Sequence, residues 1–269
     1  MVKIKGLRES VLRLLPERYT SYIRYWTFSK KLKEFMPADG TLNPVKGVYE
    51  PEMEALKNLI ERKKPEICID VGASYGSYAY FLSRLLASNQ SEIFSFEPVK
   101  SSYHVLAKTK KKFKLDKVHI FNVALSDKEG EATMEIPKNV NGLAFIQPQD
   151  TEKSSSPSEK VRLDKLDNFL RHFSKEVGFI KCDVEGSEFA VFTGAKKLLD
   201  KFKPLILCEI EQRHLDKYGI SPEATPHLLK SHGYSMFIWR NNRLEQVNNL
   251  VEGYSNYFFI HKTQISEAI

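Results

Sequence analysis

The segment 67–86, ICIDVGASYGSYAYFLSRLL, places an acid and a glycine-rich turn between an apolar run and a helix-like pattern. Asp70 ends the apolar run, and the turn that follows contains Gly72, Ala73, Ser74 and Gly76. Glycines let a backbone approach a ligand closely, and the amides at the start of a helix carry a partial positive charge. This combination predicts a ligand site at the turn.

Three kinds of nucleotide site use such a turn. A phosphate-binding P-loop ends in Gly-Lys-Ser/Thr, and this turn contains no lysine, so a P-loop is excluded. A dinucleotide site has the pattern G-x-G-x-x-G, and Ser74 stands where the second glycine would admit the pyrophosphate. S-adenosylmethionine has no phosphate to accommodate. Its cationic end suits Asp70, and its carboxylate suits the amides of residues 72–76 and of the helix start.

A second acid, Glu97, ends the next apolar run, 25 residues beyond Gly72. A carboxylate in this place can accept the hydrogens of both ribose hydroxyls of a nucleoside. A strand-ending acid or a glycine turn is a weak signal by itself. The order of Asp70, the glycine turn and Glu97 together predicts a site for S-adenosylmethionine.

Further acids follow the later apolar runs and are candidates for acid–base chemistry. Asp183 ends the run at 177–184, and it is the first candidate for a base or for an acid that binds a substrate hydroxyl. The other candidates for this role are Glu209, Glu211 and His214.

The same acids allow a metal interpretation. Asp183 with Glu209 or Glu211 could hold Mg²⁺, which would lower the pKa of a bound hydroxyl. The structural alternative concerns Glu185 and Glu188, because acids at a helix start gain about 0.3–1 kcal/mol from the helix dipole. An exposed histidine at a helix start is also common, so a structural His214 stays open.

The elements that must position these residues alternate along the chain from residue 50 onward. Helices are expected at 51–62, 75–86, 101–113, 161–170, 187–200 and 225–233, and strands at 66–71, 91–97, 117–125, 177–184, 203–211, 235–240 and 256–262. Segments 130–137 and 142–148 are expected to form a hairpin around Asn141-Gly142. Alternation with nearly continuous apolar strands predicts an α/β, doubly wound, mostly parallel sheet with an antiparallel edge. Its ligand cleft should lie at the carboxyl ends of the strands.

Asn141 and the polar segment 147–160 are expected to act either as a substrate lid or as a tether that does not contact the substrate. The three cysteines, Cys68, Cys182 and Cys208, lie in apolar runs without metal-ligand spacing, so buried thiols are expected.

The net charge of +7 is concentrated at the N-terminus. Residues 1–36 carry nine basic and three acidic side chains, a net charge of +6, so the rest of the chain is nearly neutral. The charge therefore argues against general nucleic-acid binding by a folded face. Apolar residues recur at helical spacing in this segment, which predicts helices that pack on the domain beside them, or that contact a membrane surface or another anionic partner. We find no signal peptide pattern and no apolar run long enough for a membrane span, so a cytoplasmic protein is expected.

Four motifs give the sequence a family resemblance. The segments IDVGASYGSYAYFL, FEPVKSSYHVL, NVALSDKEGEATM and IKCDVEGSEFAVFTGA resemble the successive signatures of the FkbM family of S-adenosylmethionine-dependent methyltransferases. The resemblance implies the seven-stranded, Rossmann-like class I methyltransferase fold and methyl transfer, usually to an oxygen. By position it assigns Asp70, Gly72, Ala73, Ser74 and Gly76 to the cofactor loop and Glu97 to the ribose. It assigns Asn122, Ala124 and Leu125 to the segment beside the adenine.

The expected organisation is a basic helical extension at 1–49, a methyltransferase domain at 50–262 and a tail at 263–269. The expected function is O-methylation of a hydroxyl on a small-molecule or glycan-like acceptor. Two alternatives remain: a catalytically silent, cofactor-binding adaptor that acts through the basic N-terminus, and a nicotinamide-dependent oxidoreductase. Ser74 argues against the oxidoreductase, and so does the absence of an evident Tyr-x-x-x-Lys pair. The candidate Tyr218 has Pro222, not a lysine, four residues after it.

Overall fold

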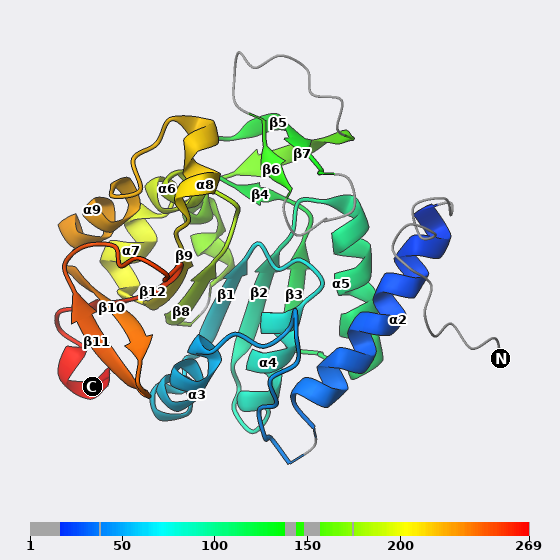
Figure 1. Cartoon of the computed structure of the whole chain (residues 1–269), viewed down its shortest axis with the longest axis horizontal. Coiled ribbons are helices and arrows are strands. Elements are labelled where there is room, and N and C mark those ends of the chain that lie inside the picture. The colour runs from blue at the N-terminus through cyan, green and yellow to red at the C-terminus, as the bar shows by residue number, and fades with distance from the viewer. Residues whose placement is uncertain (1–16, 38, 138–143, 148–156, 174, 269) are drawn as a thin grey trace.

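The structure is a computed structural model, and it describes residues 17–37, 39–137, 144–147, 157–173 and 175–268. Two sheets and the helices around them make up this part of the chain (Figure 1). The expected Asn141-Gly142 turn and most of the polar segment 147–160 lie outside the described residues.

The larger sheet has eight strands in the order β11-β10-β12-β9-β8-β1-β2-β3. Its strands in chain order are β1 (Ile67–Val71), β2 (Glu92–Phe96), β3 (Val118–Phe121), β8 (Val177–Cys182), β9 (Leu205–Glu209), β10 (Tyr234–Arg240), β11 (Arg243–Val247) and β12 (Asn256–His261). The five neighbouring strands β3, β2, β1, β8 and β9 pair in parallel, whereas β12 is antiparallel to both β9 and β10. The predicted doubly wound, mostly parallel sheet with an antiparallel edge is confirmed.

The strand count is eight and not seven, because β11 pairs antiparallel with β10 at the edge. Its sequence, RLEQV, has no apolar run, and its residues are exposed or half-buried. An edge strand of an antiparallel pair can face water, so it carries little of the hydrophobic signal that identified the central strands.

Helices cover both faces of this sheet and form two hydrophobic cores. One core receives side chains from α2 (Glu17–Phe35), α3 (Glu52–Lys63) and α4 (Ser77–Leu85). The other receives side chains from η2 (Leu166–His172), α6 (Glu188–Thr193), α7 (Lys196–Phe202) and α9 (Ala224–Ser231). The remaining helices are α5 (Lys100–Phe113), α8 (Gln212–Leu215), η3 (Asp216–Tyr218) and α10 (Ile265–Ala268).

A second, four-stranded sheet has the order β4-β7-β5-β6, and Figure 1 shows it beyond one end of the main sheet. Its strands are β4 (Ala124–Leu125), β5 (Gly130–Glu135), β6 (Phe145–Ile146) and β7 (Ser158–Asp164). The antiparallel pairing of β5 with β6 confirms the predicted strand pair.

Three predicted elements are wrong in detail. The expected strand 117–125 is two strands, β3 in the main sheet and β4 in the small one. The expected helix 161–170 is strand β7 followed by η2, because Val161 and Leu163 alternate with polar residues and pack into the core of the small sheet. The expected helix 187–200 is α6 and α7, separated where a Cβ on Gly194 would lie 2.0 Å from the carbonyl oxygen of Ser126.

Helix α2 packs beside α5, as Figure 1 shows, and contributes Leu32 and Phe35, both fully buried, to the first core. The three cysteines are buried and free, as predicted. No helix within the described ranges has the length and apolar character needed to cross a membrane. The division at residues 49 and 262 stays a prediction.

Candidate functional site

The ends of the parallel strands bring the acids identified in the sequence to one edge of the main sheet. Asp70 lies in β1, Glu97 directly follows β2, Asp183 directly follows β8, and Glu209 ends β9. Strand β1 pairs with β2 on one side and with β8 on the other, which places Asp70 beside Ser95 and Lys181. The cleft expected at the carboxyl ends of the strands therefore has an acid from each of four neighbouring strands.

The glycine turn is determined by close backbone contact. Gly72 has a φ of +82°, and a Cβ on it would lie 1.8 Å from the carbonyl oxygen of Asp183. No other residue fits there, because the turn after β1 touches the backbone that leaves β8. Gly76, with a φ of +97°, has a different reason: a Cβ would lie 2.7 Å from the side chain of Leu106 in α5. Gly76 therefore serves helix packing.

A cavity opens beside this turn, and five of the predicted cofactor residues line it: Gly72, Ser74, Glu97, Ala124 and Leu125. Asp183 and Glu185 line it from the end of β8, and Met134, Ala144 and Ile146 line it from the small sheet. The small sheet thus forms one wall of the cavity. The remaining apolar wall includes Phe96, Val99 and Val123, none of which the sequence had identified.

Glu97 faces this cavity with its charge partly compensated. Its Oε2 accepts a hydrogen bond from the amide of Ser74 and its Oε1 accepts one from the amide of Val99, each at 2.8 Å. Burial raises the pKa of Glu97 to about 7, although these two bonds oppose the shift. A carboxylate has about four lone-pair positions, so Glu97 can still accept two further hydrogen bonds from a ligand.

The other predicted cofactor residues, Asp70, Ala73, Gly76 and Asn122, do not line this cavity. Asn122 is exposed, and its Nδ2 donates to the carbonyl oxygens of Glu97 and Pro98 at 2.9 and 2.8 Å. The amides of Gly72 and Ala73 both donate to the carbonyl oxygen of Phe96 at 3.0 Å. These amides bind β2 in the structure, so their contact with a ligand carboxylate stays a prediction.

Asp70 is a buried acid with an unused oxygen. It is 1% exposed, and its Oδ2 has no hydrogen-bond partner. Burial raises the pKa of Asp70 to about 7, against the opposing effect of the Lys181 charge. A buried carboxylate oxygen without a partner destabilises the folded protein, so binding of a cationic or hydrogen-bonding ligand at Asp70 Oδ2 would be favourable.

Lys181 is the buried cation at the centre of these acids. It is 1% exposed, and its Nζ donates to Asn256 Oδ1 at 3.1 Å. The same atom lies 3.7 Å from Asp183 Oδ2 and 3.9 Å from Glu50 Oε2. Burial lowers the pKa of Lys181, but Glu50, Asp183 and Glu209 outweigh this and hold it above its ordinary value. The sequence signal for this residue was a lysine inside the apolar strand VGFIKCDV.

The structure brings the four predicted catalytic residues together and adds Glu185 to them. Burial and the nearby Asp183 carboxylate raise the pKa of Glu209. His214 is 5% exposed, its Nδ1 lies 3.0 Å from Glu185 Oε2, and its Nε2 lies 3.6 Å from Glu211 Oε2. Burial lowers the pKa of His214, against the opposing effect of the Glu211 charge. Glu211 also contacts Arg213 at the surface.

Glu188 fixes the loop that carries Glu185. The side chain is 3% exposed, and its Oε1 accepts hydrogen bonds from the amides of Val184 and Gly186 at 3.1 Å. Between these residues Glu185 has a φ of +58°. Glu188 therefore does more than complement a helix dipole: it holds the backbone on both sides of Glu185.

Comparisons with known proteins were made for the whole chain. Residues 70–236 match the family model described as the methyltransferase FkbM domain. A search of curated proteins finds no match.

Three solved structures are similar to this chain. An FkbM methyltransferase from Methylobacillus flagellatus KT is 13% identical with a TM-score of 0.49, covering 94% of this chain and 57% of its own length. This chain thus spans little more than half of that protein. An O-methyltransferase from Bacillus cereus in complex with SAH is 12% identical with a TM-score of 0.49, covering 88% of this chain and 91% of its own. The SAH-bound Podospora anserina methyltransferase PaMTH1 is 12% identical with a TM-score of 0.46, and the match covers 97% of this chain and 99% of PaMTH1.

Proposed function

Because this chain belongs to the FkbM methyltransferase family, we propose that it transfers a methyl group from S-adenosylmethionine to a hydroxyl of a small-molecule or glycan-like acceptor. Membership of the family supports S-adenosylmethionine as the cofactor. The hydroxyl acceptor rests on the acids that lie beside the cavity.

The observation that carries the proposal is the unpartnered Oδ2 of Asp70, buried at the end of β1 next to the glycine turn. Around it, the ammonium of Lys181 lies among Asp70, Asp183, Glu50 and Glu209. A site with more acids than cations favours a positively charged ligand. When bound, S-adenosylmethionine supplies an ammonium and a methyl group carried on a positively charged sulfur.

The cavity residues fit the rest of such a ligand. Glu97 has hydrogen-bond capacity left for the two ribose hydroxyls. Val123, Ala124 and Leu125 give an apolar wall for the adenine. Asn122 holds the carbonyl oxygens of Glu97 and Pro98, so its role would be to position Glu97.

Asp183 is the residue that would receive the proton of the acceptor hydroxyl. It lines the cavity, and the ammonium of Lys181 lies 3.7 Å from its Oδ2. Methyl transfer needs the attacking oxygen in line with the bond that breaks, and such alignment can lower a barrier by about 7 kcal/mol or more. A fixed Asp183 carboxylate would therefore both accept the proton of the acceptor hydroxyl and orient its oxygen toward the methyl group.

Cofactor binding is tested first, by isothermal titration calorimetry with S-adenosylmethionine and S-adenosylhomocysteine, and with NADH as the control ligand. We expect saturable one-site binding of the first two ligands and none of NADH. Glu97→Gln should weaken that binding by about tenfold to a hundredfold, the value of a hydrogen bond to a charged group. Glu92→Gln is the matched control, because Glu92 begins the same strand and contacts His119 and Lys175 at its far end. Binding of NADH alone would return the oxidoreductase alternative.

The acceptor is tested by screening alcohols and glycans with a labelled methyl group. A label recovered as a methyl ether supports the proposal, and a label found only on nitrogen or carbon contradicts O-methylation.

A partner for the basic residues 1–36 stays a separate prediction, and it is the basis of the silent-adaptor alternative. Removing residues 1–45 would also remove Leu32 and Phe35 from the core, so loss of a partner by that truncation would not identify the charge as the cause. Replacing the exposed Lys30 and Lys33 by Gln lowers the charge and leaves the core residues in place, although it removes the exposed ion pair of Lys30 with Glu34. An adaptor should lose binding to anionic vesicles in this variant, whereas an enzyme should keep its turnover.

A further inference from the structure

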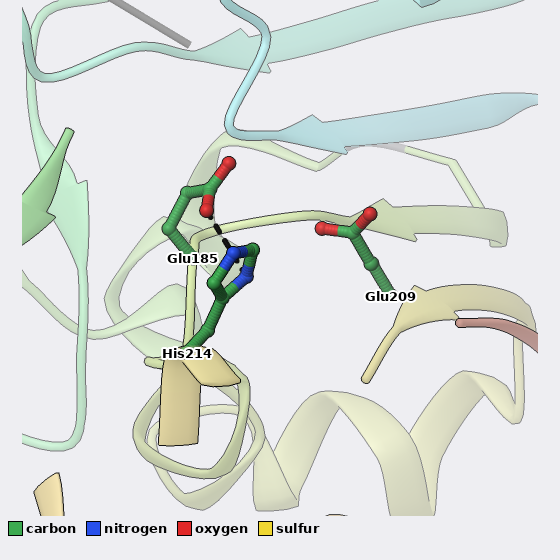
Figure 2. A group of neighbouring side chains, drawn as sticks. All are labelled: Glu185, Glu209 and His214. Atoms are coloured by element: carbon green, nitrogen blue, oxygen red, sulfur yellow. Dashed lines mark ion pairs between the residues drawn. The ribbon is translucent and has the colours of Figure 1, made fainter. Parts of the chain in front are cut away.

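Glu185, Glu209 and His214 come from three elements and point toward one another, as Figure 2 shows. Glu185 lies in the loop after β8, Glu209 ends β9, and His214 lies in α8. One ligand atom from each residue lies within 4.8 Å of the other two. The arrangement joins two carboxylates and one imidazole around a common point.

One oxygen of the buried Glu185 carboxylate, Oε2, has no hydrogen-bond partner. Glu185 is 8% exposed, and this oxygen lies 3.0 Å from His214 Nδ1, a contact that is an ion pair only when the imidazole is protonated (Figure 2). A buried carboxylate oxygen without a hydrogen-bond donor is costly unless a cation lies beside it.

The basic side chains near this cluster have other partners. Arg213 contacts Glu211, and the Nζ of Lys217 lies 3.9 Å from the ring centroid of Phe145. Lys181 donates to Asn256 and lies beside Asp183. In the described part of the chain no lysine or arginine forms an ion pair with Glu185, although the charges of Lys217 and Arg213 oppose the raising of its pKa by burial.

The types of the three ligand atoms select among metals. Mg²⁺ prefers six oxygen ligands in a near-ideal octahedron, whereas an imidazole ligand suits Zn²⁺, Fe²⁺, Ni²⁺ or Cu²⁺, and the two carboxylates also suit Mn²⁺. Ligand atoms at about 2.0–2.2 Å from such an ion lie roughly 3.3–3.6 Å apart, so small side-chain rotations would close the present arrangement. Three protein ligands leave positions open for a further oxygen.

We propose that Glu185, Glu209 and His214 bind one divalent transition-metal ion, and that its open position receives the hydroxyl oxygen of the methyl acceptor. The ligand set differs from the Mg²⁺ site considered from the sequence, which used Asp183 with Glu209 or Glu211. Asp183 stays free to act as a base, and Glu211 stays with Arg213 at the surface.

The second half of this inference rests on the proposed function. A metal ion lowers the pKa of an oxygen ligand, so the bound hydroxyl would lose its proton to the Asp183 carboxylate more readily. The resulting oxygen forms the new bond to the methyl carbon as the carbon–sulfur bond breaks, and the sulfur leaves as a neutral thioether.

The metal half is tested without cofactor or acceptor. The 269-residue protein is stripped with a chelator and titrated with Mn²⁺, and bound Mn²⁺ is measured by electron paramagnetic resonance. We expect one Mn²⁺ per chain, displaced by Zn²⁺ and not by an equal concentration of Mg²⁺. Displacement by Mg²⁺ at that concentration would overturn the assignment to a transition metal.

Variants place the ion. His214→Ala and Glu185→Gln should each weaken Mn²⁺ binding at least tenfold, since even partners outside the coordination sphere contribute tenfold to a hundredfold. His232→Ala is the matched control, because His232 pairs with a single carboxylate, that of Asp200, with Nδ1 and Oδ1 2.6 Å apart. Equal Mn²⁺ affinity in His214→Ala and the wild type would overturn the site. His214→Gln, with its thermal unfolding measured alongside, replaces His214→Ala if the smaller side chain prevents folding.

The two proposals fail in different ways. If Mn²⁺ binds at this site and no hydroxyl acceptor is methylated, the proposed O-methylation and the acceptor half of the inference fail while the metal site stands. If methyl transfer to a hydroxyl proceeds at the same rate in the chelator-stripped and the Mn²⁺-loaded protein, the acceptor half fails and the proposed function stands.

Discussion

Asp70→Asn should make the free protein more stable at alkaline pH while it weakens cofactor binding. Burial raises the pKa of Asp70 to about 7 from its ordinary value of 3.8. The folded state therefore binds the proton more tightly than the unfolded state, so the stability of the wild type falls as the pH rises between these two values. Asparagine resembles the protonated acid and avoids this loss.

The magnitude follows from the two pKa values. A difference of about three units at about 1.4 kcal/mol per unit corresponds to about 4 kcal/mol at pH above 7. At about pH 5 the wild type has lost only about 1.5 kcal/mol of its free energy of unfolding through this effect. The stability advantage of Asp70→Asn over the wild type should thus grow by about 2–3 kcal/mol between about pH 5 and about pH 8.

Urea unfolding of the cofactor-free proteins at these two pH values measures this difference. Asp116→Asn is the control, because Asp116 is an exposed aspartate in the turn after α5. Calorimetry with S-adenosylmethionine then measures the functional cost. Wild-type affinity should rise with pH through about 7, as Asp70 ionises to meet the cationic end of the ligand, and the variant should bind weakly at every pH. A stability advantage that does not change with pH, or wild-type affinity in the variant, would refute the reasoning.

Three further substitutions test the site. Asp183→Asn should lower kcat by about a hundredfold or more and leave the Kd of the cofactor nearly unchanged. Equal turnover would return the role of base to Glu209, Glu211 or His214. Gly72→Ala should cost more than about 3 kcal/mol in urea unfolding, whereas Gly219→Ala, also at positive φ but with open space around it, should cost about 1 kcal/mol; similar costs would show that the contact with Asp183 yields easily. Glu188→Ala should cost about 2–4 kcal/mol because two buried amides lose their acceptor; a loss below about 1 kcal/mol would mean that other acceptors replace it.

The sequence predicted the central strands well because their information is local. A strand buried on both faces has a nearly continuous apolar run, and β1, β2, β8 and β9 each have one. It failed where the pattern was ambiguous or weak: β7 was expected as a helix, and β11 at the sheet edge was missed. Short alternating segments and exposed edges carry too little hydrophobic signal to identify their structure.

The same distinction applies to the site. The sequence alone determined Asp70, the glycine turn and Glu97, because a parallel strand delivers the residues at its end to one edge of the sheet. Only the tertiary structure decided that Lys181 lies among the acids, that Glu188 holds the loop around Glu185, and that His214 faces Glu185. These contacts depend on which strands are neighbours and on backbone positions fixed by packing between segments far apart in the chain. No local sequence pattern contains that information, because the partners of a side chain depend on how distant segments pack in the folded protein.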